Sequence, residues 1–185
     1  MTEQVLEKLR QELEATVQAL RRELARLRTG RATTALLDGI TVDYYGARTP
    51  LNQVATLSAP EPRLLVVQPF DRSILADIER AIQQSDLGLN PVNDGKVIRI
   101  PIPELTEERR KDLVRHIRKV CEEYRVSARA HRRDAVERLR TMLKNKEIAE
   151  DDERKALEKV EALTKSYIER IDQALKHKEA EIMEV

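Results

Sequence analysis

The sequence predicts an α+β protein of two domains, in which a small β/α sandwich domain is inserted into an elongated, discontinuous three-helix bundle. All five glycines and all seven prolines lie between Gly30 and Pro103. Because Pro costs ~3 kcal/mol and Gly about 1 kcal/mol in a helix interior, the outer segments, which contain neither, suit long helices. Those segments carry apolar residues at steps of three and four, whereas the middle segment alternates as strands do.

The outer segments predict three helices. Apolar residues recur at helical spacing from Leu6 to Leu27, from Leu113 to Met142 and from Leu157 to Ile182. Thr106 is a candidate N-cap for the second helix. A short charged break separates the second and third helices, so these two should be antiparallel neighbours, and the first packs beside them after the chain returns from the middle domain.

The middle segment predicts strands and one helix. The expected strands are residues 39–46, 53–57, 63–68 and 97–102, and the helix starts at 71–73 and stops at Leu87-Gly88. Pro101 suggests an edge position for the last strand. We therefore expect the bundle to comprise residues 1–29 and 105–185, the inserted domain residues 30–104, and the hinges to lie near residues 29–31 and 102–105.

Composition and charge narrow the class of protein. The single Cys121 excludes an internal disulfide and suits a reducing compartment. We expect a monomer in the cytoplasm, because there is no apolar run of membrane-spanning length and no leader pattern, and because the bundle uses one apolar stripe from each helix. The formal net charge of +1 hides a separation: residues 104–145 hold 13 Lys and Arg against 8 Asp and Glu, whereas residues 146–185 hold 8 against 12.

The basic residues of the second helix follow one line. At ~100° per residue, Lys111, Arg118, Arg125, Arg129 and Arg132 fall within about 60° of one another, and Arg133 and Arg140 widen the stripe on one side. Aligned guanidinium groups match a phosphate backbone in geometry and charge. The competing interpretation pairs these arginines with glutamates of the acidic third helix, and the pattern alone does not separate the two. With few exposed aromatic residues and no DNA-reading motif, structured RNA would be the nucleic acid.

Two other classes of function are weaker. An enzyme is not expected, because no Gly-rich phosphate loop is present, because Cys121 has no paired cysteine, and because the histidines lack metal-ligand spacing: His116, His131 and His177. We therefore expect no cofactor and no metal site. Cys121 is expected to be a buried structural thiol. A protein-holding adaptor would need apolar patches on the helix faces, which are mostly charged.

Several motifs in order resemble the ribosome recycling factor family over essentially the whole chain. They are Leu27-Arg28-Thr29-Gly30-Arg31-Ala32, Asp43-Tyr44-Tyr45-Gly46, Ser85-Asp86-Leu87-Gly88-Leu89-Asn90-Pro91, Leu105-Thr106-Glu107-Glu108-Arg109-Arg110-Lys111-Asp112-Leu113, and Arg129 with Arg132-Arg133-Asp134-Ala135.

The resemblance implies a fold and a task. The family has a three-helix bundle joined by two hinge strands to a small sandwich domain, in a tRNA-like shape. It binds the large ribosomal subunit after termination, and elongation factor G with GTP then separates the subunits. The resemblance assigns rRNA contacts to Arg28, Arg31, Arg110, Arg129 and Arg132, to which the stripe adds Arg118, Arg125 and Arg133. It places the hinge at Gly30 and Pro103, with Arg31 and Pro101 beside them.

Two residues depart from the family pattern. Thr34 stands where proline is frequent, just past the first joint, and this change could alter the stiffness of the hinge. His131 stands where an aliphatic residue is usual. Its helical phase faces the core, so we expect a satisfied core or boundary histidine rather than a catalytic one.

Overall fold

The computed structural model describes residues 1–27 and 29–184. By contacts the chain forms two compact units, which we call the bundle unit (Met1–Leu24 with Arg110–Val185) and the insert unit (Ala25–Arg109). The α+β class and the insertion of one unit into the other are as expected. Both segments predicted as hinges, residues 29–31 and 102–105, lie inside the insert unit.

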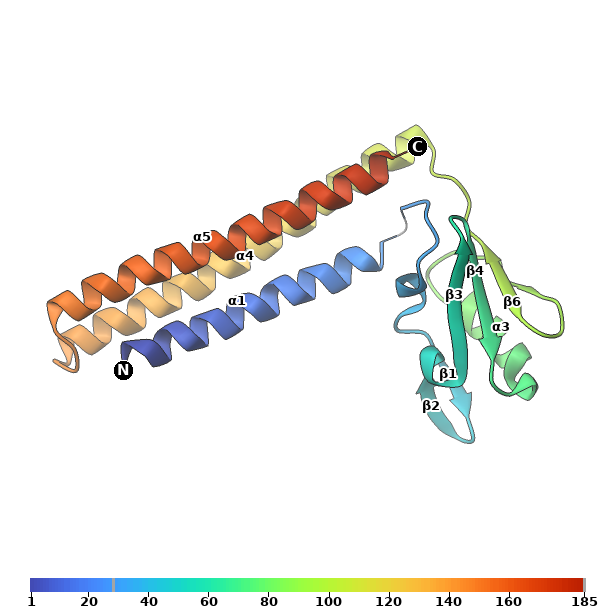
Figure 1. Ribbon diagram of the computed structural model, residues 1–185, viewed down its shortest axis with the longest axis horizontal. Helices are drawn as coiled ribbons and strands as arrows, with labels where there is room; N and C mark the ends of the chain where they lie inside the picture. The colour runs from blue at the N-terminus through green and yellow to red at the C-terminus, as the bar shows by residue number, and fades with distance from the viewer. Residues whose placement is uncertain (28, 185) are drawn as a thin grey trace. The chain divides into compact units, whose positions relative to one another are not determined.

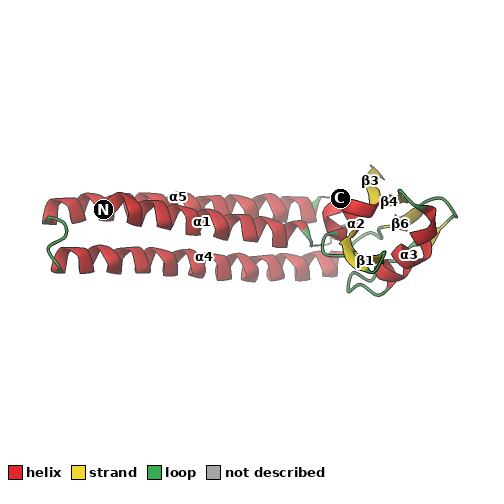
Figure 2. Ribbon diagram, turned by 90° about the horizontal axis from the view of Figure 1, so that it is seen from below, coloured by secondary structure: helices red, strands yellow, loops and turns green. Residues whose placement is uncertain are grey.

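Three long helices build the bundle unit: α1 (Thr2–Ala25), α4 (Glu107–Lys144) and α5 (Glu150–Met183). Figures 1 and 2 both show them side by side, and α4 and α5 run antiparallel, as predicted. The Thr106 hydroxyl accepts a hydrogen bond from the Arg109 amide at 3.1 Å, which confirms the expected N-cap of α4. The apolar stripes meet in a core that includes Leu13, Leu20, Ile117, Val160 and Ile171, all fully buried.

The end of α1 differs from the prediction. The helix ends at Ala25, although apolar spacing continues to Leu27. Gly30 is therefore not the C-cap of this helix. Its φ of +83° instead places a left-handed turn in the connection that follows.

The insert unit contains two sheets. A hairpin of β1 (Thr41–Tyr44) and β2 (Ala47–Pro50) forms the first. The second has the order β3-β4-β6-β5, from the strands β3 (Ala55–Glu61), β4 (Leu64–Pro69), β5 (Val92–Asn93) and β6 (Ile98–Pro101). The helix α3 (Leu75–Gln83) places Leu75, Ile78 and Ile82 in an aliphatic core shared with the sheet strands.

Several short elements were not predicted from the sequence. These are β2, β5, the single-turn helix α2 (Leu51–Val54) and the 3₁₀ turn η1 (Thr34–Leu37), whereas the start predicted for the α3 helix at residues 71–73 falls on the 3₁₀ turn η2 (Arg72–Ile74). Each is four residues or fewer, too short for apolar periodicity to register. The α3 helix also ends at Gln83, earlier than the Leu87-Gly88 stop that was expected.

The prediction of an edge position for the strand containing Pro101 was wrong. The strand β6 pairs with β4 on one side and with β5 on the other. However, β5 reaches only residues Ile98 and Arg99 of β6, so Pro101 pairs with Leu64 alone. A proline, which has no amide hydrogen, is tolerated because nothing pairs with its second side.

Candidate nucleic-acid interface

The helix α4 carries six of the eight arginines predicted to contact rRNA: Arg110, Arg118, Arg125, Arg129, Arg132 and Arg133. They share one helix because a run of 38 residues without Gly or Pro continues unbroken. Arg31 lies in the insert unit and is exposed. Arg28 lies outside the described residues.

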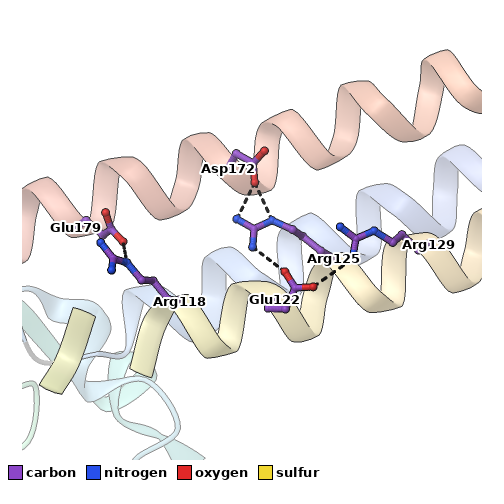
Figure 3. A network of polar contacts seen from close by, with 6 residues as sticks. All are labelled: Arg118, Glu122, Arg125, Arg129, Asp172 and Glu179. Carbon is purple, nitrogen blue, oxygen red and sulfur yellow. Dashed lines mark hydrogen bonds and ion pairs between the residues drawn. The ribbon is translucent and has the colours of Figure 1, made fainter. Parts of the chain in front are cut away.

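Figure 3 shows that the stripe meets carboxylates of α5. The Arg118 Nε lies 2.6 Å from Glu179 Oε1, and the Arg125 Nη2 lies 2.7 Å from Asp172 Oδ1. Further along, the Arg132 Nη1 lies 3.5 Å from Glu161 Oε2. The sequence offered two interpretations of the basic stripe, binding of RNA and pairing with acidic residues of the third helix. These contacts are ion pairs of the second kind, and they join α4 to α5.

The pairs follow the antiparallel register. Going seven residues forward along α4, from Arg118 to Arg125, goes seven residues back along α5, from Glu179 to Asp172, as antiparallel helices require. At ~100° per residue, Glu161, Asp172 and Glu179 lie on one face of α5. This acidic stripe is visible in the sequence, but only the register of the two helices assigns its members to particular arginines.

Arg125 is the most enclosed of these arginines. Its side chain is 18% exposed, against 62% for Arg118. Burial acts to lower the pKa of Arg125, but hydrogen bonds to Asp172 and Glu122 outweigh it and raise the pKa. Hydrogen bonds from Arg125 and Arg129 lower the pKa of Glu122. Arg125 therefore joins α4 to α5 and is less open to a ligand than the other arginines of the stripe.

Arg118, Arg129 and Arg132 remain available to a ligand. Each is substantially exposed, and each ion pair is open to water. Exposed pairs of this kind stabilise a protein by about 0–1 kcal/mol, so exchanging a carboxylate for a phosphate costs little. Arg110 differs, because its Nε is buried and makes no hydrogen bond among the residues described.

A broader cationic face lies on the solvent side of α4, rotated from the predicted stripe. Between about 20° and 100° from Arg118, taking ~100° per residue, basic residues outnumber the acidic Glu108, Glu122 and Glu137. We call these seven residues the α4 cationic face: Lys111, Arg115, Lys119, Arg129, Arg133, Arg140 and Lys144. Within the described part of the chain, Arg133 and Arg140 are exposed and form no ion pair. The face points almost directly away from the core stripe.

Polar contacts also join α1 to its neighbours. The Arg170 Nη1 of α5 lies 2.6 Å from Glu14 Oε2, and the Tyr124 hydroxyl donates to Glu23 at 2.6 Å. The His131 Nδ1 lies 2.8 Å from Glu12 Oε2, and the imidazole is partly buried. This agrees with the expectation of a satisfied boundary histidine.

Cys121 is fully buried, and burial raises the pKa of its thiol to about 11. A thiol that stays protonated at neutral pH is a poor nucleophile. The expectation that Cys121 is a buried thiol is therefore confirmed.

The residues predicted as a hinge are found in the connections of the insert unit. Gly30 has its positive φ next to Leu105, whose Cγ would lie 3.4 Å from an added Cβ. Pro101 ends β6, and Pro103 follows it on the surface. Ile102 between them donates its amide hydrogen to the Arg63 carbonyl at 2.8 Å.

Other kinds of site find no support in residues 1–27 and 29–184. No three of their His, Cys, Asp and Glu side chains gather in a way that could hold a metal ion. None of the helices they form is long and apolar enough to cross a membrane. Large apolar side chains exposed on the described bundle unit are few and scattered: Met1, Val126 and Met183.

The fold and this face define an α+β protein of two units, in which a three-helix bundle presents one cationic helix. The family model for ribosome recycling factor matches residues 20–183. This chain belongs to the ribosome recycling factor family. It is 58% identical to the ribosome-recycling factor of Halalkalibacterium halodurans, with both chains covered completely.

Two solved structures are also similar. A solution structure of the ribosome recycling factor is 41% identical with a TM-score of 0.82, over 100% of this chain and 98% of the other. The second contains the T. thermophilus ribosome recycling factor and the E. coli elongation factor G bound to the E. coli post-termination complex. It is 45% identical with a TM-score of 0.70, and both chains are covered completely.

Proposed function

We propose that this chain recycles ribosomes in the cytoplasm, acting as a monomer after translation termination. It binds the large ribosomal subunit, and elongation factor G with GTP then separates the post-termination complex into subunits. The observation that carries this proposal is family membership over the whole chain, with relatives matched from end to end. A similar protein has been placed together with elongation factor G on a post-termination complex.

In this proposal the bundle unit docks on rRNA through α4. Arg129, Arg132 and Arg133 contact phosphates, with Arg118 and the rest of the α4 cationic face beside them. Arg110, Arg31 and Arg28 extend the contact, as the family resemblance implies. Charge-assisted hydrogen bonds from guanidinium to phosphate supply the affinity, and the partly exposed ion pairs to α5 hold the side chains ready.

The step that follows is mechanical. Elongation factor G hydrolyses GTP, whereas this chain makes and breaks no covalent bond. Movement takes place at the two connections near residues 29–31 and 102–105. Gly30 allows backbone dihedrals closed to other residues, and Pro101 and Pro103 stiffen the returning strand.

The first experiment measures co-sedimentation with large ribosomal subunits from low to high salt. We expect the wild-type chain to bind and the double variant Arg129→Ala, Arg132→Ala to bind more weakly, with a shallower salt dependence. Equal affinity at every salt concentration, with the fold retained, would remove these arginines from the interface.

The second experiment measures splitting of post-termination complexes with elongation factor G and GTP. Splitting should require all three components together. The isolated chain should hydrolyse no GTP. Turnover by the chain alone, or splitting without it, would contradict the mechanical role.

A further inference from the structure

Glu122 is an acidic residue within a basic surface. Taking ~100° per residue, it lies about 40° from Arg118, inside the sector of the α4 cationic face. Two other acidic residues share that sector, Glu108 and Glu137, and in the described part of the chain neither of them forms an ion pair. Glu122, in contrast, contacts two arginines. Because a negative charge repels phosphate, its presence on a surface proposed to bind RNA calls for an explanation.

Each oxygen of the Glu122 carboxylate accepts a hydrogen bond from a different arginine. Oε2 accepts from Arg125 Nη1 at 3.0 Å, and Oε1 accepts from Arg129 Nη1 at 3.1 Å. Figure 3 shows Glu122 joined to both side chains. A carboxylate has two acceptor oxygens and no donor, so it can hold two guanidinium groups at once. An amide side chain would turn its NH₂ donor towards one of them.

Arg125 fixes one side of this carboxylate. Its Nε and Nη2 lie 2.8 and 2.7 Å from Asp172 Oδ1 on α5, and its side chain is only 18% exposed. An enclosed arginine whose planar guanidinium is bound on both helices has little freedom to rotate. The Nη1 of Arg125 therefore keeps the Glu122 carboxylate in a defined position, with Oε1 directed to Arg129.

Arg129 is held by Glu122 and still has donors to offer. It follows Glu122 by seven residues, ~10.5 Å along the helix axis, and its side chain reaches back because helix side chains tilt towards the N-terminus. Among the described residues only its Nη1 makes a hydrogen bond. A guanidinium carries five N–H donors, and this side chain is 46% exposed. The remaining donors are open to a phosphate.

We propose that Glu122 is a positioning residue for RNA binding: anchored by Arg125, it holds the Arg129 guanidinium in the orientation that contacts a phosphate. This inference rests on the proposed function, in which Arg129 contacts rRNA. An unrestrained arginine on a helix surface samples many rotamers and loses that freedom when it binds. An arginine that is already held loses less on binding, so its contact with phosphate is stronger.

The alternative is that Glu122 competes with phosphate for Arg129, and the two roles predict effects of opposite sign. If Glu122 acts only through its charge, removing that charge should strengthen the attraction between α4 and RNA. If Glu122 positions Arg129, the same change should weaken binding. Glu122→Gln separates the two, because it keeps the size of the side chain while removing the charge and one acceptor oxygen.

The test measures binding of the full chain to large ribosomal subunits from low to high salt. We expect Glu122→Gln to weaken binding about two- to tenfold, the cost of ordering one long side chain. The slope of log affinity against log salt should not change, because Arg129 still meets its phosphate. The matched control is Glu137→Gln, which removes the same charge from the same face where the described residues form no ion pair. It should bind as tightly as the wild type or more tightly.

A second comparison shows whether Glu122 acts through Arg129. In a chain that already carries Arg129→Ala, adding Glu122→Gln should cause no further loss of affinity. Circular dichroism confirms that each variant is folded. Because the Glu122 side chain is 53% exposed, its replacement by an amide of the same size should leave the bundle unit intact.

Binding by Glu122→Gln that equals or exceeds binding by the wild type would overturn the proposal, since Glu122 would then compete with phosphate. An equal loss from Glu122→Gln in the presence and absence of Arg129 would overturn it as well, because the effect would pass through another group. Failure of the wild-type chain to bind large subunits would instead contradict the proposed function itself.

Discussion

Arg125 of α4 and Asp172 of α5 form a close contact between the two long helices, in which Nε and Nη2 of the arginine lie 2.8 and 2.7 Å from one carboxylate oxygen. A further hydrogen bond joins the Arg125 Nη1 to Glu122 at 3.0 Å. The arginine is enclosed, whereas Arg118 and Arg129 of the same stripe are open to solvent. Their helical phase places these residues on one face of α4, but they differ in how far each side chain is exposed to solvent.

Arg125→Ala should lower the free energy of unfolding by about 1 kcal/mol, because it removes hydrogen bonds between charged groups that are partly shielded from water. Arg133→Ala is the matched control, since Arg133 is exposed on the same helix. It should change stability by no more than about 0.5 kcal/mol. Urea unfolding of the two variants measures this difference, and equal stabilities would show that the contact with Asp172 contributes nothing.

Arg133→Gln with Arg140→Gln should weaken binding to large ribosomal subunits while leaving stability unchanged. Both side chains belong to the α4 cationic face, and losing two phosphate contacts should reduce the slope of log affinity against log salt by about 1 to 2. Arg10→Gln is the control, because Arg10 is exposed on α1 and pairs with Glu7. If Arg10→Gln reduced the slope as much, the binding surface would not be specific to α4.

Gly30→Ala should destabilise the chain by about 1 kcal/mol, because its φ of +83° is unfavourable for alanine. Gly88→Ala, at a φ of +63° with nothing within 4 Å of an added Cβ, should have a similar cost. The 3.4 Å approach to Leu105 at Gly30 is ordinary contact. Thermal unfolding compares the two stabilities.

Splitting assays with the same two variants test the hinge. Gly30→Ala should slow the splitting of post-termination complexes, whereas Gly88→Ala should not. Equal splitting rates for the two variants would show that the hinge does not depend on Gly30.

Asp94 should make the stability of the insert unit sensitive to acid. Backbone amides of Val97 and Lys96, helped by Arg99 and opposed by burial, lower the pKa of Asp94 to about 2. A carboxyl with a lowered folded-state pKa stabilises fully above its unfolded pKa of about 3.9, and this contribution is lost as the pH falls towards 2. The melting temperature should therefore fall between pH 4 and pH 2. The free energy of unfolding changes by ~2.303RT per pH unit for each proton that the unfolded state binds in excess of the folded state.

In the Asp94→Asn variant the melting temperature should fall less between pH 4 and pH 2 than in the wild type, because the side chain no longer titrates. Asp86→Asn, at an exposed carboxyl of the same unit, should keep the wild-type profile. Identical profiles for the wild type and Asp94→Asn would show that the turn formed by residues 94–97 does not depend on the charge of Asp94.

Much of the fold was predictable because it depends on local rules. Excluding Gly and Pro from the ends of the chain permits long helices, and steps of three and four set the buried face of each helix. The Thr106 N-cap is equally local. Apolar spacing past the true end of α1 misled the prediction, since Leu27 is only partly buried and lies outside the helix.

The candidate site was predictable only in part. Helical phase placed Arg118, Arg125, Arg129 and Arg132 on one line, but it carried no information about which carboxylates of α5 would face them. The positive φ of Tyr45, in the two-residue turn between β1 and β2, was also hidden, because Tyr-Gly is not a usual sequence for such a turn and only the backbone dihedrals reveal it.

By itself the sequence determined the two-unit organisation, the helical faces and the family, since these follow from residue order and spacing along one chain. The tertiary structure decided that Arg125 is enclosed, that Arg133 and Arg140 are free among the described residues, and that β6 is an interior strand. The physical reason is that burial and pairing depend on the register between segments distant in sequence, and register is set by packing of the whole unit.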